Sequence, residues 1–266
     1  RERRRGRGPF SGMEPPVLVS YLDGDKSVCI ITLNRPKQLN SLNPSLVAEL
    51  AAVFARLRGE EGLKCVVLTG AGRAFSAGVD LSDPPNAVEQ ASDDPAHLAN
   101  NPTHQMALLP VPIIGAINGF AITGGMEIAL ACDILIGSTN AVFKDTHVKF
   151  GLAPCWGLSQ RLSKLVGPSR AQYMSYTAAG VSGKKAYEWG MLVAVTEPDG
   201  LMEAARKIAM QIASNDQDMV AKYKSVLHAG MRTTHGDGLA LERRKGLAHY
   251  KGMDLGGGVA GWKSKL

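Results

Sequence analysis

Two stretches of sequence decide the fold: Phe75-Ser-Ala-Gly-Val-Asp-Leu81 and Gly119-Phe-Ala-Ile-Thr-Gly-Gly-Met-Glu-Ile-Ala-Leu-Ala-Cys-Asp133. Each places a glycine-bearing segment directly after an apolar run, so an oxygen atom can approach the main chain closely at Val79 and at Gly124. Two backbone N–H donors that converge on one oxygen atom form an oxyanion hole. The sequence therefore predicts a site that stabilises an enolate beside a carboxylate.

The carboxylate belongs to Glu127, which follows Gly124 by three residues, about one helical turn. Gly124 and Gly125 open the expected helix, so the Gly124 amide is an unsatisfied donor at the positive end of the helix dipole. Apolar neighbours on every side leave Glu127 little polar helix face to share. We expect a site carboxylate whose raised pKa suits proton chemistry.

The spacing of these two stretches resembles that of the crotonase (enoyl-CoA hydratase/isomerase) family, from about Val17 to the C-terminus. The resemblance implies an α/β crotonase-like fold of repeated ββα units with a helical C-terminal region. It also implies hydration of trans-2-enoyl-CoA thioesters to 3-hydroxyacyl-CoA in fatty-acid β-oxidation. The amides of Val79 and Gly124 would hold the thioester oxygen, and Glu127 would be the acid/base residue. No cofactor is expected, because the CoA thioester is the substrate.

The chain departs from the hydratase pattern at His147, which stands where the family's second catalytic glutamate is expected. Three explanations stay open: His147 replaces that glutamate as proton donor, it only orients water, or hydratase activity is lost. Imidazole titrates near neutrality, which makes the first chemically reasonable. Asp145 is a possible partner of His147 if the segment is extended, because residues two apart share a strand face.

The sequence indicates the substrate-binding residues less specifically than the catalytic ones. The turn that contains Arg35 and Lys37 resembles the family's early CoA-contacting loop. We expect Asp80 to fix loop geometry rather than to react. The remaining residues expected to line the groove flank the two glycine-bearing segments and the His147 segment: Ala77, Gly78, Gly125 and Asp145.

Three other functions compete with hydration. A double-bond isomerase needs only one carboxylate and an oxyanion hole, and a non-catalytic acyl-CoA-binding protein is motivated by the missing glutamate. A serine hydrolase is suggested by Ala74-Phe-Ser-Ala-Gly78, which mimics a nucleophile elbow. That match is weak, because prolines follow at Pro84 and Pro85 where an elbow requires a helix.

Composition describes an ordinary globular chain of 266 residues, 45% hydrophobic and 20% charged. No apolar run approaches the roughly 18 to 20 residues of a membrane span. Residues 1–7 hold five arginines and one glutamate, which carry four of the six net positive charges, so nucleic-acid binding is not expected. The scattered histidines predict no metal site, and the four unpaired cysteines predict reduced thiols.

The two ends carry separate expectations. Residues 1–12 are expected to be a disordered basic arm or a segment introduced for expression, because Met13 could start the natural chain. The tripeptide Ser264-Lys265-Leu266 matches a peroxisomal address, so peroxisomal localisation and an import receptor are expected. Residues 13–200 are expected to form the crotonase-like core, and 201–263 a helical region that builds a homotrimer or homohexamer, as the family resemblance implies.

Local patterns predict strands at 17–21, 28–33, 65–68, 113–117 and 134–136, and helices at 124–131 and after Asn43-Pro44. Residues 82–103 hold four prolines and little periodicity, which predicts a long flexible loop. From Gly157 onward helical patterns dominate, and helices are expected at 158–166, 168–179, 184–189, 201–213, 218–228 and 239–250.

Overall fold

The computed structural model describes residues 14–252 of the chain. The expected N-terminal arm and the C-terminal tripeptide therefore lie outside the described residues. The chain divides into two compact units, one that runs to Gln217 and one that begins at Asp218. All the expected site residues belong to the first unit.

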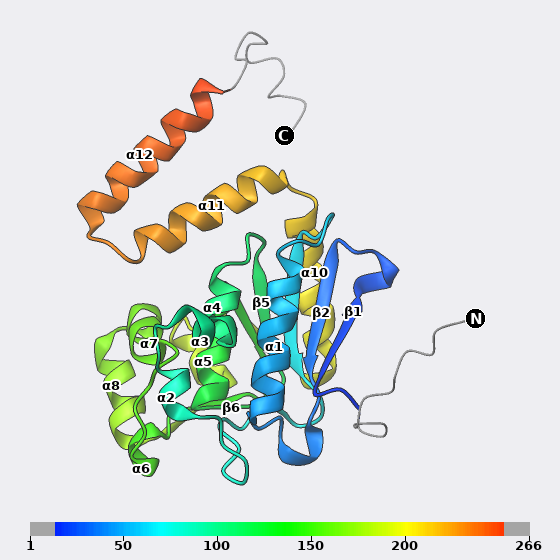
Figure 1. Ribbon diagram of the computed structural model, residues 1–266, viewed down its shortest axis with the longest axis vertical. Coiled ribbons are helices and arrows are strands. Elements are labelled where there is room, and N and C mark those ends of the chain that lie inside the picture. The colour runs from blue at the N-terminus through cyan, green and yellow to red at the C-terminus, as the bar shows by residue number, and fades with distance from the viewer. Residues whose placement is uncertain (1–13, 253–266) are drawn as a thin grey trace. The chain divides into compact units, whose positions relative to one another are not determined.

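A six-stranded sheet forms the centre of the first unit. Its strand order is β1 (Val17–Tyr21), β2 (Val28–Leu33), β3 (Cys65–Gly70), β5 (Ile113–Ile117), β7 (Ile134–Ser138) and β10 (Ala194–Thr196). β1 pairs antiparallel with β2, and the following neighbours pair in parallel. Figure 1 shows α1 (Pro44–Leu57) in front of this sheet and α10 (Leu201–Ala213) behind it. The five strands predicted from sequence are confirmed.

Both faces of the sheet are covered, which explains why its strands read as continuous apolar runs. Successive side chains of a strand point to opposite faces. Val66 and Leu68 accordingly belong to the large core that includes α1, whereas Cys65 and Val67 belong to the core on the α10 side. The helical region expected from residue 201 thus begins with a helix of the first unit.

Helix α1 forms as its sequence predicts. The Asn43 side chain accepts a hydrogen bond from the Leu46 amide at 3.0 Å, and Pro44 occupies the first helical position, where its missing N–H costs nothing. The buried face of α1 is an apolar stripe that is at most 1% exposed and consists of Leu46, Leu50, Val53, Phe54 and Leu57.

A second sheet of short strands, which the sequence does not predict, places the two glycine-bearing segments together. Its strand order is β4 (Ala74–Ser76), β6 (Phe120–Ile122), β8 (Val142–Lys144) and β9 (Gly180–Ser182). β4, β6 and β8 are parallel, so their carboxyl ends emerge at one edge. Gly78 adopts φ +87°, and a Cβ there would lie 2.6 Å from the carbonyl oxygen of Ile122, so the close approach requires glycine.

The prediction of a long flexible loop over residues 82–103 is wrong, because much of this segment is helical. Three short helices, α2 (Ala87–Gln90), α3 (Pro95–Ala99) and α4 (Pro102–Ala107), occupy and follow this segment. Pro95 and Pro102 stand at the first turns of their helices, where proline is favoured, and Asn or Asp caps precede all three. The prolines that predicted a loop are therefore compatible with helices, because two of them stand at helix starts.

The remaining helices of the first unit are α5 (Gly124–Leu130), α6 (His147–Phe150), α7 (Leu158–Val166), α8 (Pro168–Thr177) and α9 (Gly183–Glu188), with 3-10 turns at Leu22–Gly24, Pro36–Gln38 and Pro198–Gly200. α11 (Gln217–Gly230) begins at the unit boundary, and α12 (His235–Lys251) follows in the second unit. Within residues 14–252, every helix is too short or too polar to cross a lipid bilayer.

Candidate active site

Two backbone amides without acceptors lie at the edge where β4 and β6 end. Over residues 14–252, neither the Val79 N–H nor the Gly124 N–H donates to another group of the chain. The start of α5 lies against β4, since a Cβ on Gly125 would come within 2.4 Å of the Ser76 carbonyl oxygen. The fold thus leaves two backbone donors unused, one in the loop after β4 and one at the start of α5.

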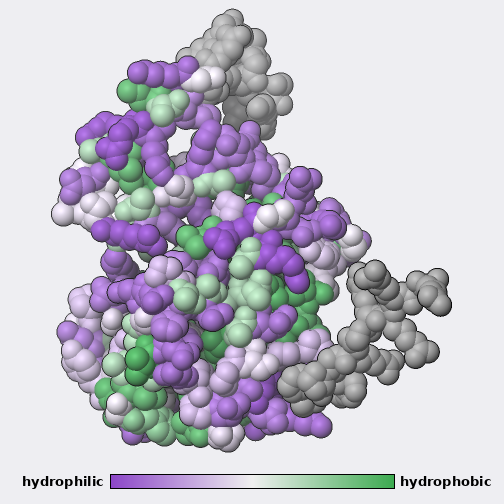
Figure 2. Space-filling view, in the orientation of Figure 1, coloured by the Kyte–Doolittle hydropathy of each residue, from purple (hydrophilic) through white to green (hydrophobic). Residues whose placement is uncertain are grey.

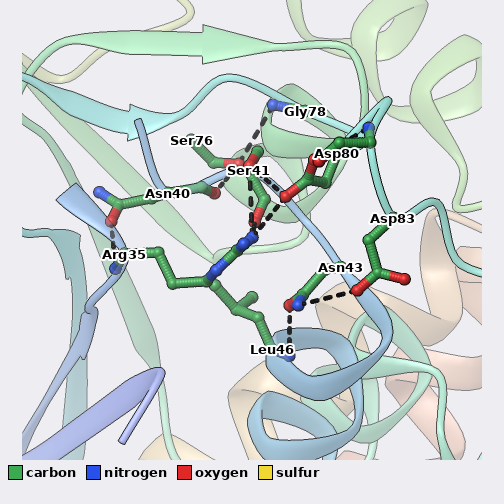
Figure 3. Close-up of polar contacts among 10 residues, drawn as sticks. Arg35, Asn40, Ser41, Asn43, Leu46, Ser76, Gly78, Asp80 and Asp83 are labelled. Atoms are coloured by element: carbon green, nitrogen blue, oxygen red, sulfur yellow. Dashed lines mark hydrogen bonds and ion pairs between the residues drawn. The ribbon is translucent and has the colours of Figure 1, made fainter. Parts of the chain in front are cut away.

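The loop that carries Val79 is fixed by an ion pair between Arg35 and Asp80 (Figure 3). Nη1 of Arg35 lies 2.9 Å from Oδ2 of Asp80 and donates at 2.5 Å to the Ser41 carbonyl. The Ser41 hydroxyl donates to the same carboxylate oxygen at 3.0 Å, and the Ser82 hydroxyl donates to Oδ1 at 2.6 Å. This geometry supports the loop-fixing role expected of Asp80.

The residues expected to bind substrate differ in whether their polar groups are exposed or already bound within the chain. The Arg35 guanidinium, expected to contact CoA, binds Asp80 and Ser41 within the chain. Lys37 is exposed on the turn that follows. Ala77 is half-buried and donates its N–H to the Leu39 carbonyl at 2.9 Å.

Asp80→Asn is expected to lower the free energy of unfolding by about 2 to 3 kcal/mol at neutral pH, because it removes a buried charge from Arg35. The hydrogen bond from the Ser82 hydroxyl is the main cause that holds the pKa of Asp80 well below its ordinary 3.8. Burial acts in the opposite direction, and hydrogen bonds from Arg35 and Ser41 lower the pKa further. A depressed pKa contributes stability that is present above 3.8 and lost as the pH falls toward the folded-state value.

The measurement is urea unfolding at neutral pH and in steps toward the acid limit of the folded protein. The difference between the wild type and Asp80→Asn should shrink only in the acid steps. Asp83→Asn is the matched control, because Asp83 lies in the same loop and makes an exposed 3.3 Å contact with Asn43. Equal stabilities of the two variants at neutral pH would contradict the role of Asp80.

Glu127 points inward, as the sequence predicts, and is 3% exposed. Its Oε1 accepts hydrogen bonds from the Trp156 amide at 2.9 Å and from the Leu158 amide at 3.3 Å. Its Oε2 lies 3.8 Å from Nε2 of His147. Burial raises the pKa of Glu127, although the Trp156 N–H and the His147 charge act in the opposite direction.

His147 and Asp145 form a buried pair. Nδ1 of His147 lies 2.7 Å from Oδ1 of Asp145, which also accepts from the His147 backbone N–H at 3.1 Å. Burial acts upward on the pKa of Asp145, but hydrogen bonds from His147 and Ser175 lower it overall. An ionised carboxylate only accepts, so Nδ1 of His147 carries the proton of this bond, and Nε2 of the ring faces Glu127.

Asp145 contacts His147, as expected, but the two residues do not share a strand face. β8 ends at Lys144 and α6 begins at His147, so the two side chains meet across a turn rather than along a strand face. The turn brings Asp145 and His147 beside Glu127, which lies on α5.

Ser76 is not placed as a nucleophile. It is fully buried on β4, its hydroxyl donates to the Asn40 carbonyl at 2.8 Å, and it accepts from the Gly78 amide at 3.2 Å (Figure 3). An elbow serine must instead be exposed above a helix. The hydroxyl stabilises the turn before Val79.

Other features of the site bear on its chemistry. Among residues 14–252, no three His, Cys, Asp or Glu side chains are grouped so that they could hold a metal ion. Trp156, whose backbone N–H binds Glu127, is not among the site residues predicted from the sequence. The adjacent Gly157, at φ +97°, is the signal that could have indicated a tight turn there.

Apolar side chains are exposed on the segment that follows His147. Val148 is 54% exposed, Phe150 55% and Leu152 39%. Figure 2 shows hydrophobic surface at the lower left, where Figure 1 draws α6 and α8.

Comparisons with known proteins show which family the chain resembles. The family model for enoyl-CoA hydratase/isomerase matches residues 23–260. A protein of Arabidopsis thaliana described as a probable peroxisomal enoyl-CoA hydratase 1 is 42% identical, over 89% of this chain and 88% of its own length. The crystal structure of an enoyl-CoA hydratase subunit from Geobacillus kaustophilus matches with a TM-score of 0.81 and 32% identity, over 94% of this chain and 95% of its own. A monofunctional enoyl-CoA isomerase from M. smegmatis matches with a TM-score of 0.72 and 29% identity, over 85% of this chain and 98% of its own.

Proposed function

Because the chain belongs to the enoyl-CoA hydratase/isomerase family, we propose that it adds water to trans-2-enoyl-CoA thioesters to give 3-hydroxyacyl-CoA in peroxisomal fatty-acid β-oxidation. One observation carries the proposal: the buried Glu127 carboxylate faces Nε2 of a His147 ring that Asp145 orients. Two groups able to accept a proton thus face each other across 3.8 Å. A water molecule that donates one hydrogen to each can be held there.

The amides of Val79 and Gly124 take the thioester oxygen in this mechanism. Attack of water on C3 moves electron density through the double bond to that oxygen, and the enolate charge develops there. Donors already fixed by the fold need no reorganisation as the charge appears. The Arg35–Asp80 pair and the Ser76 hydroxyl hold the Val79 segment in place.

Glu127 and His147 manage the protons. The water oxygen forms the new C–O bond at C3 while one of its hydrogens passes to Glu127 or to Nε2 of His147. A proton from this pair then bonds C2, which collapses the enolate to the 3-hydroxyacyl thioester. Of the three explanations open for His147, we infer that it replaces the second glutamate, because Asp145 binds Nδ1 and thereby turns Nε2 toward Glu127, where an imidazole nitrogen can exchange a proton.

The test is to mix the purified protein with crotonyl-CoA and, separately, with a trans-3-enoyl-CoA, whose double bond is not conjugated to the thioester. A hydratase removes the conjugated absorbance of crotonyl-CoA, and this is the expected result. Rising conjugated absorbance from the trans-3 substrate, with crotonyl-CoA unchanged, would make the protein a double-bond isomerase. Binding of both esters without turnover would make it an acyl-CoA-binding protein.

We also propose peroxisomal delivery through an import receptor and assembly as a homotrimer or homohexamer. The printed name of the Arabidopsis relative and the Ser264-Lys265-Leu266 sequence support the first. The exposed Val148 and Phe150 support the second. Diffuse localisation of a fluorescent fusion that ends in this tripeptide, or sedimentation as a monomer, would overturn the respective proposal.

A further inference from the structure

The backbone of Thr123 is strained. It adopts φ 50° and ψ −111°, outside the regions that L-residues populate, and a β-branched residue is a clear outlier there. Glycine would adopt this conformation without a Cβ penalty. Thr123 stands between β6 and α5, directly before Gly124. We therefore expect the Thr123 side chain to make hydrogen bonds that offset the backbone strain.

The Thr123 hydroxyl is engaged entirely by the neighbouring segment. Oγ1 of Thr123 forms a very short hydrogen bond with Oγ1 of Thr146 and accepts from the Thr146 backbone N–H at 3.1 Å. The Thr123 N–H donates to the Lys144 carbonyl at 2.8 Å. Thr123 is 5% exposed and Thr146 is 9% exposed, so water does not compete strongly for these bonds.

The two threonines join the two halves of the site. Thr123 precedes the free amide of Gly124, and its carbonyl accepts the Glu127 N–H at 2.9 Å, so its conformation sets the start of α5. Thr146 lies between Asp145 and His147, at the turn where that pair forms. The bond between the two threonines therefore links the segment of Gly124 and Glu127 to the segment of His147.

We propose that Thr123 and Thr146 are a positioning pair that keeps the Gly124 amide and Glu127 in register with the Asp145–His147 pair. The inference rests on the proposed hydratase function. The pair contacts no reacting atom in this account, and it acts through the backbone on either side of it. A misplacement of about 1 Å in a catalytic arrangement can lower the rate about 100-fold. Accurate placement of the site can therefore offset the cost of the strained Thr123 backbone.

The test compares matched variants by steady-state kinetics with crotonyl-CoA. Thr123→Val and Thr146→Val keep the branched shape without the hydroxyl, and each should lower kcat about 10- to 100-fold with little change in KM. The double variant should be no slower than the slower single one, because both remove the same bond. Thr123→Ser, which keeps the hydroxyl, should restore most of the rate.

Two further variants separate positioning from stability. Thr69→Val removes a buried hydroxyl that donates to the Ala116 carbonyl at 2.9 Å in the six-stranded sheet, so it should lower Tm and leave kcat unchanged. Thr123→Gly relieves the strained backbone and should fold at least as stably as Thr123→Val, yet be equally slow. Variants that lose stability but keep wild-type kcat would overturn the inference while the hydratase function stands.

A readout that needs no turnover is the nitrogen NMR spectrum of the His147 ring, identified among the six histidines by its loss in His147→Gln. Thr123→Val should shift the His147 ring signals, although Thr123 is placed on another segment, and Thr69→Val should not. If the wild type fails to hydrate crotonyl-CoA, the proposed function falls and this spectrum alone decides the inference. Unmoved His147 signals in both Thr123→Val and Thr146→Val would overturn it.

Discussion

Glu127→Gln is expected to lower kcat for crotonyl-CoA hydration by about 10²- to 10⁴-fold, the range for loss of a positioned acid/base group. Glutamine keeps the size of the side chain and an oxygen that accepts from the Trp156 and Leu158 amides, so the fold and KM should change little. It cannot take up a proton from water. The measurement is the initial rate of loss of the conjugated thioester absorbance, together with Tm for each protein.

The pH profile sharpens this prediction. Burial raises the pKa of Glu127 above its ordinary 4.5, and Glu127 must be ionised to accept a proton. The rate of the wild type should therefore fall as the pH drops through that raised pKa, and the residual rate of Glu127→Gln should lack this acid limb. Glu49→Gln, on the exposed face of α1, is the control and should behave as wild type. A Glu127→Gln rate within a few-fold of wild type would remove Glu127 from the mechanism.

Asp145→Asn is expected to lower kcat by about 10²-fold or more, through His147 rather than through substrate contact. An asparagine amide group can turn its NH₂ toward Nδ1, which moves the ring proton to Nε2 and turns the acceptor that faces Glu127 into a donor. The shape of the pair is retained, so the loss should appear in kcat more than in KM.

The measurement is steady-state kinetics beside nitrogen NMR of the His147 ring. In the wild type the proton should reside on Nδ1, which lies 2.7 Å from the Asp145 carboxylate, and in Asp145→Asn it should move toward Nε2. Asp93→Asn, at an exposed position, is the control for the charge change. Wild-type kcat in Asp145→Asn would show that the orientation of His147 does not matter, and would leave water activation to Glu127 alone.

Long or strongly patterned elements could be predicted from the sequence. The Asn43 cap and a stripe of apolar residues predict helix α1, and a continuous apolar run predicts β3. The three-residue strands of the second sheet were missed, because β4, β6 and β8 are too short to carry a period and exist through pairing across the chain. The helices near Pro95 and Pro102 were missed because proline marks helix starts as well as breaks.

The candidate site divides in the same way. Glu127 could be found because a carboxylate in an apolar helix is anomalous, and the glycine at 78 because a tight approach of two strands requires it. The engagement of Arg35 by Asp80 could not be found, since it depends on a loop packed against a distant one. Thr123 and Thr146 gave no local signal, because their bond exists only when β6 and β8 lie side by side.

The most direct test of the central claim is mass spectrometry of the product formed from crotonyl-CoA in water enriched in heavy oxygen. If the protein is a hydratase, the wild type forms a product heavier than crotonyl-CoA by one solvent water, with the heavy oxygen at C3, and Glu127→Gln and His147→Gln form almost none. An unchanged mass would contradict hydration: with the double bond moved, the enzyme is an isomerase, and with the bound ester intact, it is a binding protein.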